Sequence, residues 1–584
     1  MMNYSKQSSD SKRTRNLILI VAAAAAALAL CCCLALVVVL VLDPFQWDLI
    51  GRLTGKGTNP TAKAIPADAG IFMGVNLVNA TPDKLDRVII PFKNAAKEAG
   101  LEVDDTQSLE DQLNTQLEEL GITIQDITPW IGQYVGLGIF DLSLDEYGTV
   151  EETHLVLAVE ARNRKAADDF LVKLRDGLAD QGGATFSEVA YEGVKMYLFE
   201  DGGQQLGFCR SKNLVLLGTG QADLEKAIQA QGSQSLNDVA GYKDLIKRLP
   251  SERALTMFVS SEQYRQLYAS FLEEFEGGMF ADISLEQAMA LYWDEMAASF
   301  SIVEEGIQMD VLVSYDLANL TGDQRLMVQS VGGASKSVNM LPGDTLFFYG
   351  GRRLDLTWGS IRELAGQTSS QEDFAESMAL FKQQFGFDPD AELFSVLDGE
   401  WMVGVFPDDE GLLVEAAELP LGFALLAQTS QPKVIQSTLS ALNDSLGDQG
   451  FQVVEQQVKG QTVFDLSLPE QELLLFSYGL NGEYLSIGSS HATLEGMINQ
   501  KDSLAQNLQF KQSWQSFPSA MQPVMYLNLD QALSLLREKQ TPLDVEEFEQ
   551  AMAFLEPIPS LTLAISPLDG NVVAVRLLVS LEQP

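Results

Sequence analysis

The longest apolar stretch covers residues 17–42, which read LILIVAAAAAALALCCCLALVVVLVL without a charged side chain. A helix of this length reaches about 39 Å, enough to cross the roughly 30 Å hydrocarbon core of a bilayer. A cleaved signal peptide would have a shorter apolar stretch that ends at a small-residue site. A lipoprotein leader would need one cysteine near the end of a short leader, whereas Cys31, Cys32 and Cys33 lie in the middle of the run. The pattern therefore predicts a transmembrane helix.

Positive charge precedes this run. Residues 1–16 contain four Lys and Arg side chains against a single acid, Asp10. Short flanks rich in Lys and Arg stay on the cytoplasmic side of a membrane. We therefore expect residues 1–16 to form a basic cytoplasmic tail. The single membrane-spanning helix would then place the C-terminal region outside the cytoplasm, at the cell membrane.

The hydrophobic pattern beyond residue 64 repeats. Six blocks recur in unbroken order at an offset of 266–276 residues, which is typical of an internal duplication. Ile65-Pro66-Ala67-Asp68 matches Leu341-Pro342-Gly343-Asp344. The segment LVLAVEARNRKAADDFLVKLRDGL at 155–178 matches FALLAQTSQPKVIQSTLSALNDSL at 423–446.

The repeat predicts the organisation of the exterior region. Two homologous halves are expected at residues 65–318 and 341–582. Residues 43–64 show no sustained period and predict a tether, and residues 319–340 predict a linker with a short helix.

Periodicity within each half predicts the fold class. Alternating runs such as Thr153–Glu160 and Ile307–Ser314 are typical of half-buried antiparallel strands. Ala166–Gly177 has apolar residues at helical spacing. Groups of adjacent strands mixed with packed helices indicate two α+β halves with mainly antiparallel sheets.

Composition narrows the function classes. The 584 residues include 38 Lys+Arg and 81 Asp+Glu, a formal net charge of −43, and 46% are hydrophobic. The apolar content is sufficient for folded cores. Nucleic acid is excluded as a partner, because its phosphates must be neutralised by basic side chains. Only Cys209 lies outside the predicted membrane helix, so we expect no disulfide in the exterior region.

Several segments resemble ligand-binding loops. The segment at residues 51–58 is similar to a P-loop but lacks its Ser/Thr and its preceding strand. Gly218-Thr219-Gly220 follows a predicted strand, and helix capping explains it better than dinucleotide binding. Asp141, Ser143, Asp145 and Glu152 have a spacing like that of a calcium loop without its glycine. A solvated loop is the preferred interpretation there, and weak calcium binding stays open.

Catalytic chemistry has few candidates. His154 and His491 are the two histidines, and neither is accompanied by a G-x-S-x-G motif. We expect no catalytic, cofactor or metal site, and no enzyme. Arg352 and Arg353 are candidates for a minor anion-binding site. Pairing of these two side chains with local carboxylates is the alternative.

These features together resemble a known family. The basic N-terminus, the single apolar helix, the Pro-x-Asp strand entrances at Pro66 and Pro342, and the Gly-x-aromatic strand at Gly132 are similar to bacterial single-pass proteins grouped as "domain of unknown function 3352". The resemblance implies a bacterial source and an extracytoplasmic location. It implies no site residues.

The resulting functional hypothesis is a membrane-anchored extracytoplasmic protein that acts as a non-enzymatic binding or envelope-organising module. A carrier of a lipid or another apolar ligand in a cavity is the alternative, and a hydrolase is the third. The expected partners are the bilayer, through residues 17–42, and an envelope protein or apolar ligand.

Overall fold

The computed structural model describes residues 59–79, 82–98, 122–144, 150–182, 184–201, 204–232, 234–260, 262, 293–359, 362, 371–410, 413–414, 420–469, 473–500, 502–538 and 555–582. The predicted cytoplasmic tail, the predicted transmembrane helix at 17–42 and the P-loop-like segment at 51–58 lie outside these residues. Within these ranges, no helix is long and apolar enough to span a bilayer.

Strands dominate the structure. They are β1 (Ile71–Asn76), β2 (Ile131–Leu144), β3 (Val150–Ala161), β4 (Ser187–Tyr191), β5 (Val194–Asp201), β6 (Gln204–Ser211), β7 (Leu214–Gly218), β8 (Leu255–Ser260), β9 (Trp293–Ile302), β10 (Gly306–Tyr315), β11 (Phe347–Arg352), β12 (Glu400–Pro407), β13 (Leu421–Gln428), β14 (Gln452–Val458), β15 (Gln461–Leu468), β16 (Leu473–Asn481), β17 (Tyr484–Gly488), β18 (Gln522–Asn528), β19 (Ser560–Ile565) and β20 (Val572–Ser580).

The helices connect the strands. The α-helices are α2 (Pro82–Glu98), α4 (Ile124–Ile127), α5 (Arg164–Gly182), α6 (Gln221–Ala230), α7 (Ala240–Arg248), α10 (Gly322–Ser330), α12 (Gln371–Phe385), α13 (Pro389–Glu392), α15 (Pro432–Asp448), α16 (His491–Asn499), α17 (Leu508–Trp514) and α18 (Leu529–Glu538). The 3₁₀ turns are η2 (Pro60–Lys63), η3 (Leu236–Asp238), η4 (Ser337–Asn339), η5 (Phe394–Val396) and η6 (Leu504–Gln506).

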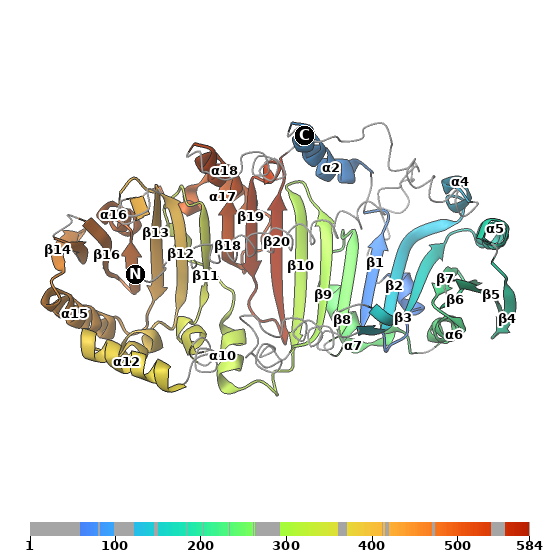
Figure 1. Cartoon of the computed structure of the whole chain (residues 1–584), viewed down its shortest axis with the longest axis horizontal. Helices are drawn as coiled ribbons and strands as arrows, with labels where there is room; N and C mark the ends of the chain where they lie inside the picture. The colour runs from blue at the N-terminus through green and yellow to red at the C-terminus, as the bar shows by residue number, and fades with distance from the viewer. Residues whose placement is uncertain are drawn as a thin grey trace, which may run out of the picture.

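All the strands belong to one antiparallel sheet of 20 strands, which runs along the long axis of the molecule (Figure 1). The pairings give the order β4-β5-β6-β7-β3-β2-β1-β8-β9-β10-β20-β19-β18-β11-β12-β13-β17-β16-β15-β14. The predicted α+β class with antiparallel strands is confirmed. The sequence analysis did not foresee a single continuous sheet.

The order of strands reads the same from both ends. Each pairing among β1–β10 recurs among β11–β20 with the strand numbers raised by ten, and the β10–β20 pair lies at the centre. The two Pro-x-Asp motifs also have matching contacts, because Pro66 bridges to Ser235 and Pro342 bridges to Ser503.

Each set of ten strands has its own aromatic core. One aromatic cluster with mainly edge-to-face contacts packs beneath each set, with ring centroids 5.1–6.1 Å apart. The clusters are Phe72, Tyr242 and Phe258 in the first set and Phe348, Phe510 and Tyr526 in the second. The two cores therefore lie under corresponding strands on the same face of the sheet, which we call the covered face.

The predicted tether ends earlier than residue 64. Residues 60–63 form η2, and Thr61, Ala62 and Ala64 are fully buried. Ala62 and Ala64 belong to the same core cluster as Phe72. The boundary at residue 65 was therefore too late, because small apolar side chains in an aperiodic segment gave no sign of burial.

The predicted linker at 319–340 is an integral part of the fold. It contains the expected short helix, α10, and buries Leu320 and Val328 against Val573 of β20. The buried Glu400 carboxylate accepts hydrogen bonds from the backbone N–H groups of Lys336 at 3.0 Å and Ser337 at 3.4 Å. These contacts fix the path of the chain from one set of strands to the other.

The central seam joins the two sets through β10 and β20, which pair from Gly306↔Ser580 to Ser314↔Val572. At its midpoint Asp310 lies opposite Arg576, and the Arg576 Nε donates to Asp310 Oδ1 at 2.7 Å. Asp310 is buried and the Arg576 side chain is 15% exposed, and Gln308 Nε2 donates to the second carboxylate oxygen at 2.6 Å.

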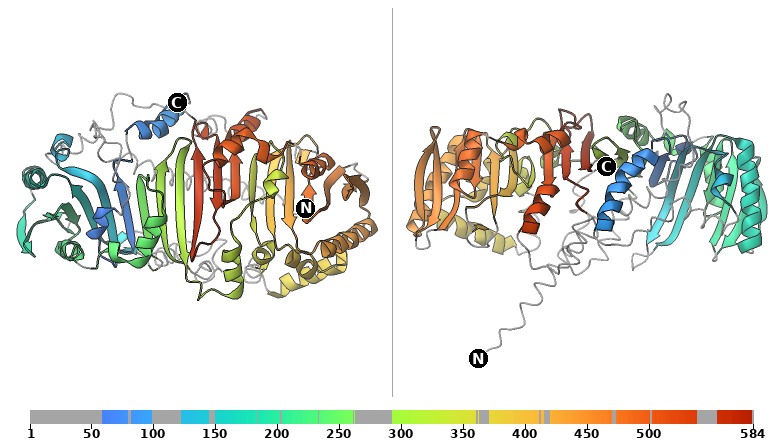
Figure 2. Two further views of the ribbon diagram at one scale, coloured as in Figure 1. Left: turned by 180° about the vertical axis from the view of Figure 1, so that it is seen from behind. Right: turned by 90° about the horizontal axis from the view of Figure 1, so that it is seen from above.

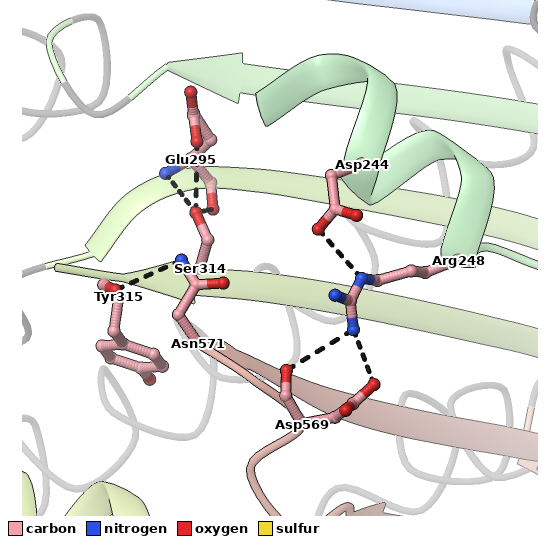
Figure 3. Close-up of polar contacts among 7 residues, drawn as sticks. All are labelled: Asp244, Arg248, Glu295, Ser314, Tyr315, Asp569 and Asn571. Carbon is pink, nitrogen blue, oxygen red and sulfur yellow. Dashed lines mark hydrogen bonds and ion pairs between the residues drawn. The ribbon is translucent and has the colours of Figure 1, made fainter. Parts of the chain in front are cut away.

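A second ion pair crosses the seam at the surface. Arg248 extends from α7 to Asp569 in the β19–β20 connection at 2.7 Å and also contacts Asp244 (Figure 3). Beside it, the backbone N–H of Tyr315 donates to the Asn571 carbonyl at 2.9 Å. The Asp569 side chain is 87% exposed, so water screens this pair.

We predict that Asp310→Asn destabilises the full chain by about 3 kcal/mol, because it leaves the Arg576 charge buried without its partner. Asp569→Asn is the matched control, and it should cost less than about 1 kcal/mol because that ion pair is exposed. Urea unfolding followed by tryptophan fluorescence measures both values. Equal losses in the two variants would contradict the central role of the buried pair.

Candidate functional site: an apolar face of the sheet

The covered side of β10 holds three polar side chains, while its outward side is apolar. Gln308, Asp310 and Ser314 are buried on the covered face. Met309 and Val311 alternate with them and are only half-buried on the opposite face. An antiparallel sheet with one solvated face normally turns its polar side chains towards water. In β10, Met309 and Val311 face outward, and Leu312 is the apolar side chain that joins the polar ones on the covered face.

This apolar surface continues across neighbouring strands. Residues in direct cross-strand register form one unbroken row over eight strands, which spans roughly 34 Å at the usual strand spacing. We call this row the apolar face. It consists of Phe300, Met309, Leu577, Leu563, Met525, Tyr349, Val403 and Leu425.

Every member of the apolar face is partly accessible. Tyr349 is 48% exposed, and its ring packs against Trp401 at a centroid distance of 5.6 Å. The other seven side chains are half-buried. A second row runs beside it and includes the half-buried Val311, Val575 and Ile565. Contiguous apolar surfaces of this extent mark interaction sites on soluble proteins.

Helices bound this surface at both ends of the central strands. At one end, Val88 of α2 and Leu529 of α18 share a cluster with Ile307 and Val579. Figure 2 shows α2 in blue and α18 in red on the same side of the sheet. At the other end, Val328 of α10 packs with Ile565. The apolar face lies between these helices.

The two arginines proposed for anion binding have separate partners. Arg353 lies at positive φ and holds Asp355 with two hydrogen bonds of 2.6 and 2.9 Å. This hydrogen bond raises the pKa of Arg353 above its ordinary value. Arg352 donates instead to Gln522 Oε1 and to the Ala334 carbonyl, both at 3.1 Å. Pairing with a local carboxylate, the alternative interpretation, describes Arg353.

Each histidine contacts an aspartate that links a helix to the sheet. His154 Nδ1 lies 3.2 Å from the Asp223 carboxylate, and His491 Nδ1 lies 3.0 Å from Asp465 Oδ1. Ser477 donates to that same Asp465 oxygen at 2.6 Å, not to the imidazole. This arrangement differs from a Ser-His-Asp triad, in which the serine hydroxyl bonds to the histidine.

The calcium-like spacing lies on a paired hairpin. Asp141 is in register with His154, and Ser143 is in register with Glu152, so these positions are strands and not a continuous loop. Asp145 lies outside the described residues. Across the described part of the chain, no group of three or more His, Cys, Asp or Glu side chains could hold a metal ion.

The strand-to-helix turns resemble each other only in part. Ser490 caps α16 by accepting a hydrogen bond from the Thr493 backbone N–H at 3.1 Å, as the capping interpretation predicts. Gly220 occupies the N-cap of α6 and has no side chain to serve as a cap. Thr219 instead donates to Asp223 at 2.7 Å.

Comparison with known proteins follows from this geometry. A family model described as "Protein of unknown function (DUF3352)" matches residues 22–581. The chain belongs to this family. Among curated proteins, none matches the sequence.

Solved structures offer only distant similarity. Crystal form III of TP0453 is 9% identical, with a TM-score of 0.24 over 48% of this chain and 90% of that one. Crystal form I is 6% identical, with a TM-score of 0.23 over 45% of this chain and 82% of that one. A likeness at this level supports no conclusion about function.

Sequence reasoning missed the apolar face. The alternation at Ile307–Ser314 predicted a half-buried strand, but it did not indicate which side of the strand is covered. The buried polar residues at Gln308 and Asp310 were the available signal. This signal can be interpreted only when β20 is known to place Arg576 opposite Asp310.

Cys209 is fully buried, and desolvation raises the pKa of its thiol to about 12. Since the thiolate is the nucleophile, we predict that iodoacetamide does not modify Cys209 in the folded chain at about pH 8.5. Modification should appear only when urea unfolds the protein. Mass mapping of the Cys209 peptide measures the extent of modification at Cys209 separately from that at the other cysteines. Rapid native labelling would contradict this burial.

Because the thiol pKa is higher in the folded than in the unfolded state, its contribution to stability is lost as pH rises above about 9.

Proposed function

We propose that this chain is a membrane-anchored extracytoplasmic binding module whose apolar face contacts an apolar surface of another envelope protein. One observation carries the proposal: the outward face of the central strands is apolar while their covered face holds Asp310 and Gln308. A sequence that buries charge and leaves Met309 half-exposed is best explained if a partner completes the burial.

Residues 17–42 would anchor the module to the bilayer, with residues 1–16 in the cytoplasm. Residues 43–584 carry 34 basic and 80 acidic side chains, so they would be repelled from anionic lipid head groups. This repulsion favours a protein partner over the membrane surface for the apolar face. Methionines such as Met309 and Met525 are unbranched and can adapt to an irregular partner surface.

The two strand sets are proposed to be tandem copies, within residues 65–318 and 341–582. The identical order of pairings in β1–β10 and β11–β20 supports this origin. Duplication would lengthen the apolar face without a new fold, since joining β10 to β20 continues each row of side chains across the seam.

The test uses the full chain in its host cell with a photoreactive benzoylphenylalanine at Leu563 of the apolar face. The control position is Leu508, which is 75% exposed on α17, away from the apolar face. We expect a protein adduct of one mass at position 563 and none at 508. Adding Leu577→Gln should lower the yield of the adduct at position 563 about fivefold, as expected for loss of one interfacial apolar contact.

Mass spectrometry of the adduct distinguishes the alternatives. A protein adduct that depends on Leu577 supports the proposal. A lipid adduct at position 563 would replace it with the carrier hypothesis. Equal adducts at positions 563 and 508, or none at position 563, would overturn the assignment of the apolar face as a binding surface.

A further inference from the structure

The two ends of the sheet carry the same arrangement of a long helix over a hairpin. Helix α5 packs beside β4–β5 at one end, and α15 packs beside β14–β15 at the other (Figure 1). Both hairpins turn through two residues at positive φ, Glu192-Gly193 and Lys459-Gly460.

Individual positions correspond between these ends. Glu188 lies opposite Tyr197 in the first hairpin, and Glu455 lies opposite Phe464 in the second. The core positions of the helices match as well. They are Ala167, Leu171, Leu174 and Leu178 in α5 and Ile435, Leu439, Leu442 and Leu446 in α15. The side chains around each hairpin can therefore be compared one by one.

At the first end, two cations fill the space between helix and hairpin. The Arg175 guanidinium lies 5.4 Å and the Lys195 ammonium 4.8 Å from the centre of the Tyr197 ring. Lys195 also pairs with Glu188 at 2.7 Å, and Arg175 pairs with Asp176 at 2.5 Å. The Tyr197 ring is buried beneath these charges.

At the second end, the anions and the ring remain but both cations are replaced. Asp444, Glu455 and Phe464 occupy the positions of Asp176, Glu188 and Tyr197. The residues that correspond to Arg175 and Lys195 are Asn443 and Thr462. Asn443 accepts a hydrogen bond from the Tyr478 hydroxyl at 2.5 Å, so its carboxamide is held towards the sheet.

A groove of about 1110 Å³ lies where the cations are missing. Asp444, Glu455, Phe464, Asn443 and Thr462 all line it, and none of its described lining residues is basic. The Phe464 ring is partly accessible, whereas Tyr197 is buried. Neither carboxylate has an ion-pair partner among the residues that the structure describes.

We propose that this groove binds an arginine or lysine side chain of a partner polypeptide, over the Phe464 ring and beside Asp444 and Glu455. The first end of the same molecule demonstrates the contact, because Arg175 and Lys195 occupy that position there. A cation over an aromatic ring and next to a carboxylate is attracted both by the negative face of the ring and by the charge of the carboxylate. The two carboxylates are exposed, so the rest of a bound chain can remain in solvent.

The experiment measures binding of acetyl-Gly-Arg-Gly-amide to the full chain in detergent by saturation-transfer NMR at about 0.15 M salt, where long-range surface attraction is screened. The neutral control is the same peptide with citrulline in place of arginine. We expect affinity for the citrulline peptide to be at least about fivefold lower, as expected for loss of a cation–π contact and its carboxylate partner.

Three variants locate the contact. Glu455→Gln should weaken arginine-peptide binding about threefold, whereas the matched Glu188→Gln at the first end should leave it unchanged. Asn443→Arg combined with Thr462→Lys restores the cations of the first end and should abolish binding. Circular dichroism of each variant checks that it folds. Leu577→Gln on the apolar face should leave peptide binding unchanged, which separates this groove from the proposed binding surface.

Several outcomes would overturn the proposal. Equal binding by the wild-type chain and by the double variant would indicate general attraction to an acidic surface. Equal affinity for the arginine and citrulline peptides would remove the role of charge. Spermidine is tested in parallel. If it binds in a Glu455-dependent way while the peptide does not, the ligand is a free polyamine and not a polypeptide side chain.

Discussion

The pairing of β10 with β20 is the constraint on which the rest of the structure depends. It converts two sets of ten strands into one sheet, and its midpoint holds the buried Asp310–Arg576 pair. The two residues occupy corresponding positions in their sets, since each lies at the centre of its seam strand. Identical residues there would place like charges or two apolar groups face to face. Opposite charges instead make each set complementary to the other. The pairing of β10 with β20 is favoured over other strand pairings, because separating the two strands would leave a buried charge without its partner.

The seam also places polar groups on the covered face of the sheet. Asp310 and Gln308 lie on the side where α7 and α17 pack, and their hydrogen bonds offset the cost of burying them. Because successive residues of a strand point to opposite faces, Met309 and Val311 then have to point outward. The apolar face is therefore the geometric consequence of a polar, charge-paired centre. The row continues into both sets because the seam keeps the strands in register.

Away from the seam, the two sets differ in a way that changes their chemistry. Their turns, cross-strand pairs and helix cores correspond, but the cations at the end of the first set have no counterpart at the end of the second. The first end is closed by Arg175 and Lys195, and the second is open above Phe464. Two surfaces of different chemistry thus arise on one repeated architecture: an apolar strip at the centre and an anionic, aromatic groove at one end.

The sequence by itself determined the α+β fold class, because this depends on local periodicity. It also paired motifs such as those at Pro66 and Pro342, which make matching bridges in the sheet. It also predicted a short helix within 319–340, and α10 lies there, with a Thr321 cap that the structure shows. It could not determine that the repeats share one sheet, since strand pairing between residues 266 positions apart leaves no local pattern. The tertiary structure alone decided which side of each strand is covered, where Arg576 meets Asp310, and which of the many acidic residues lie beside Phe464 in the groove. Those properties depend on contacts between distant segments, and alternation along a single strand specifies two faces without specifying which one water reaches.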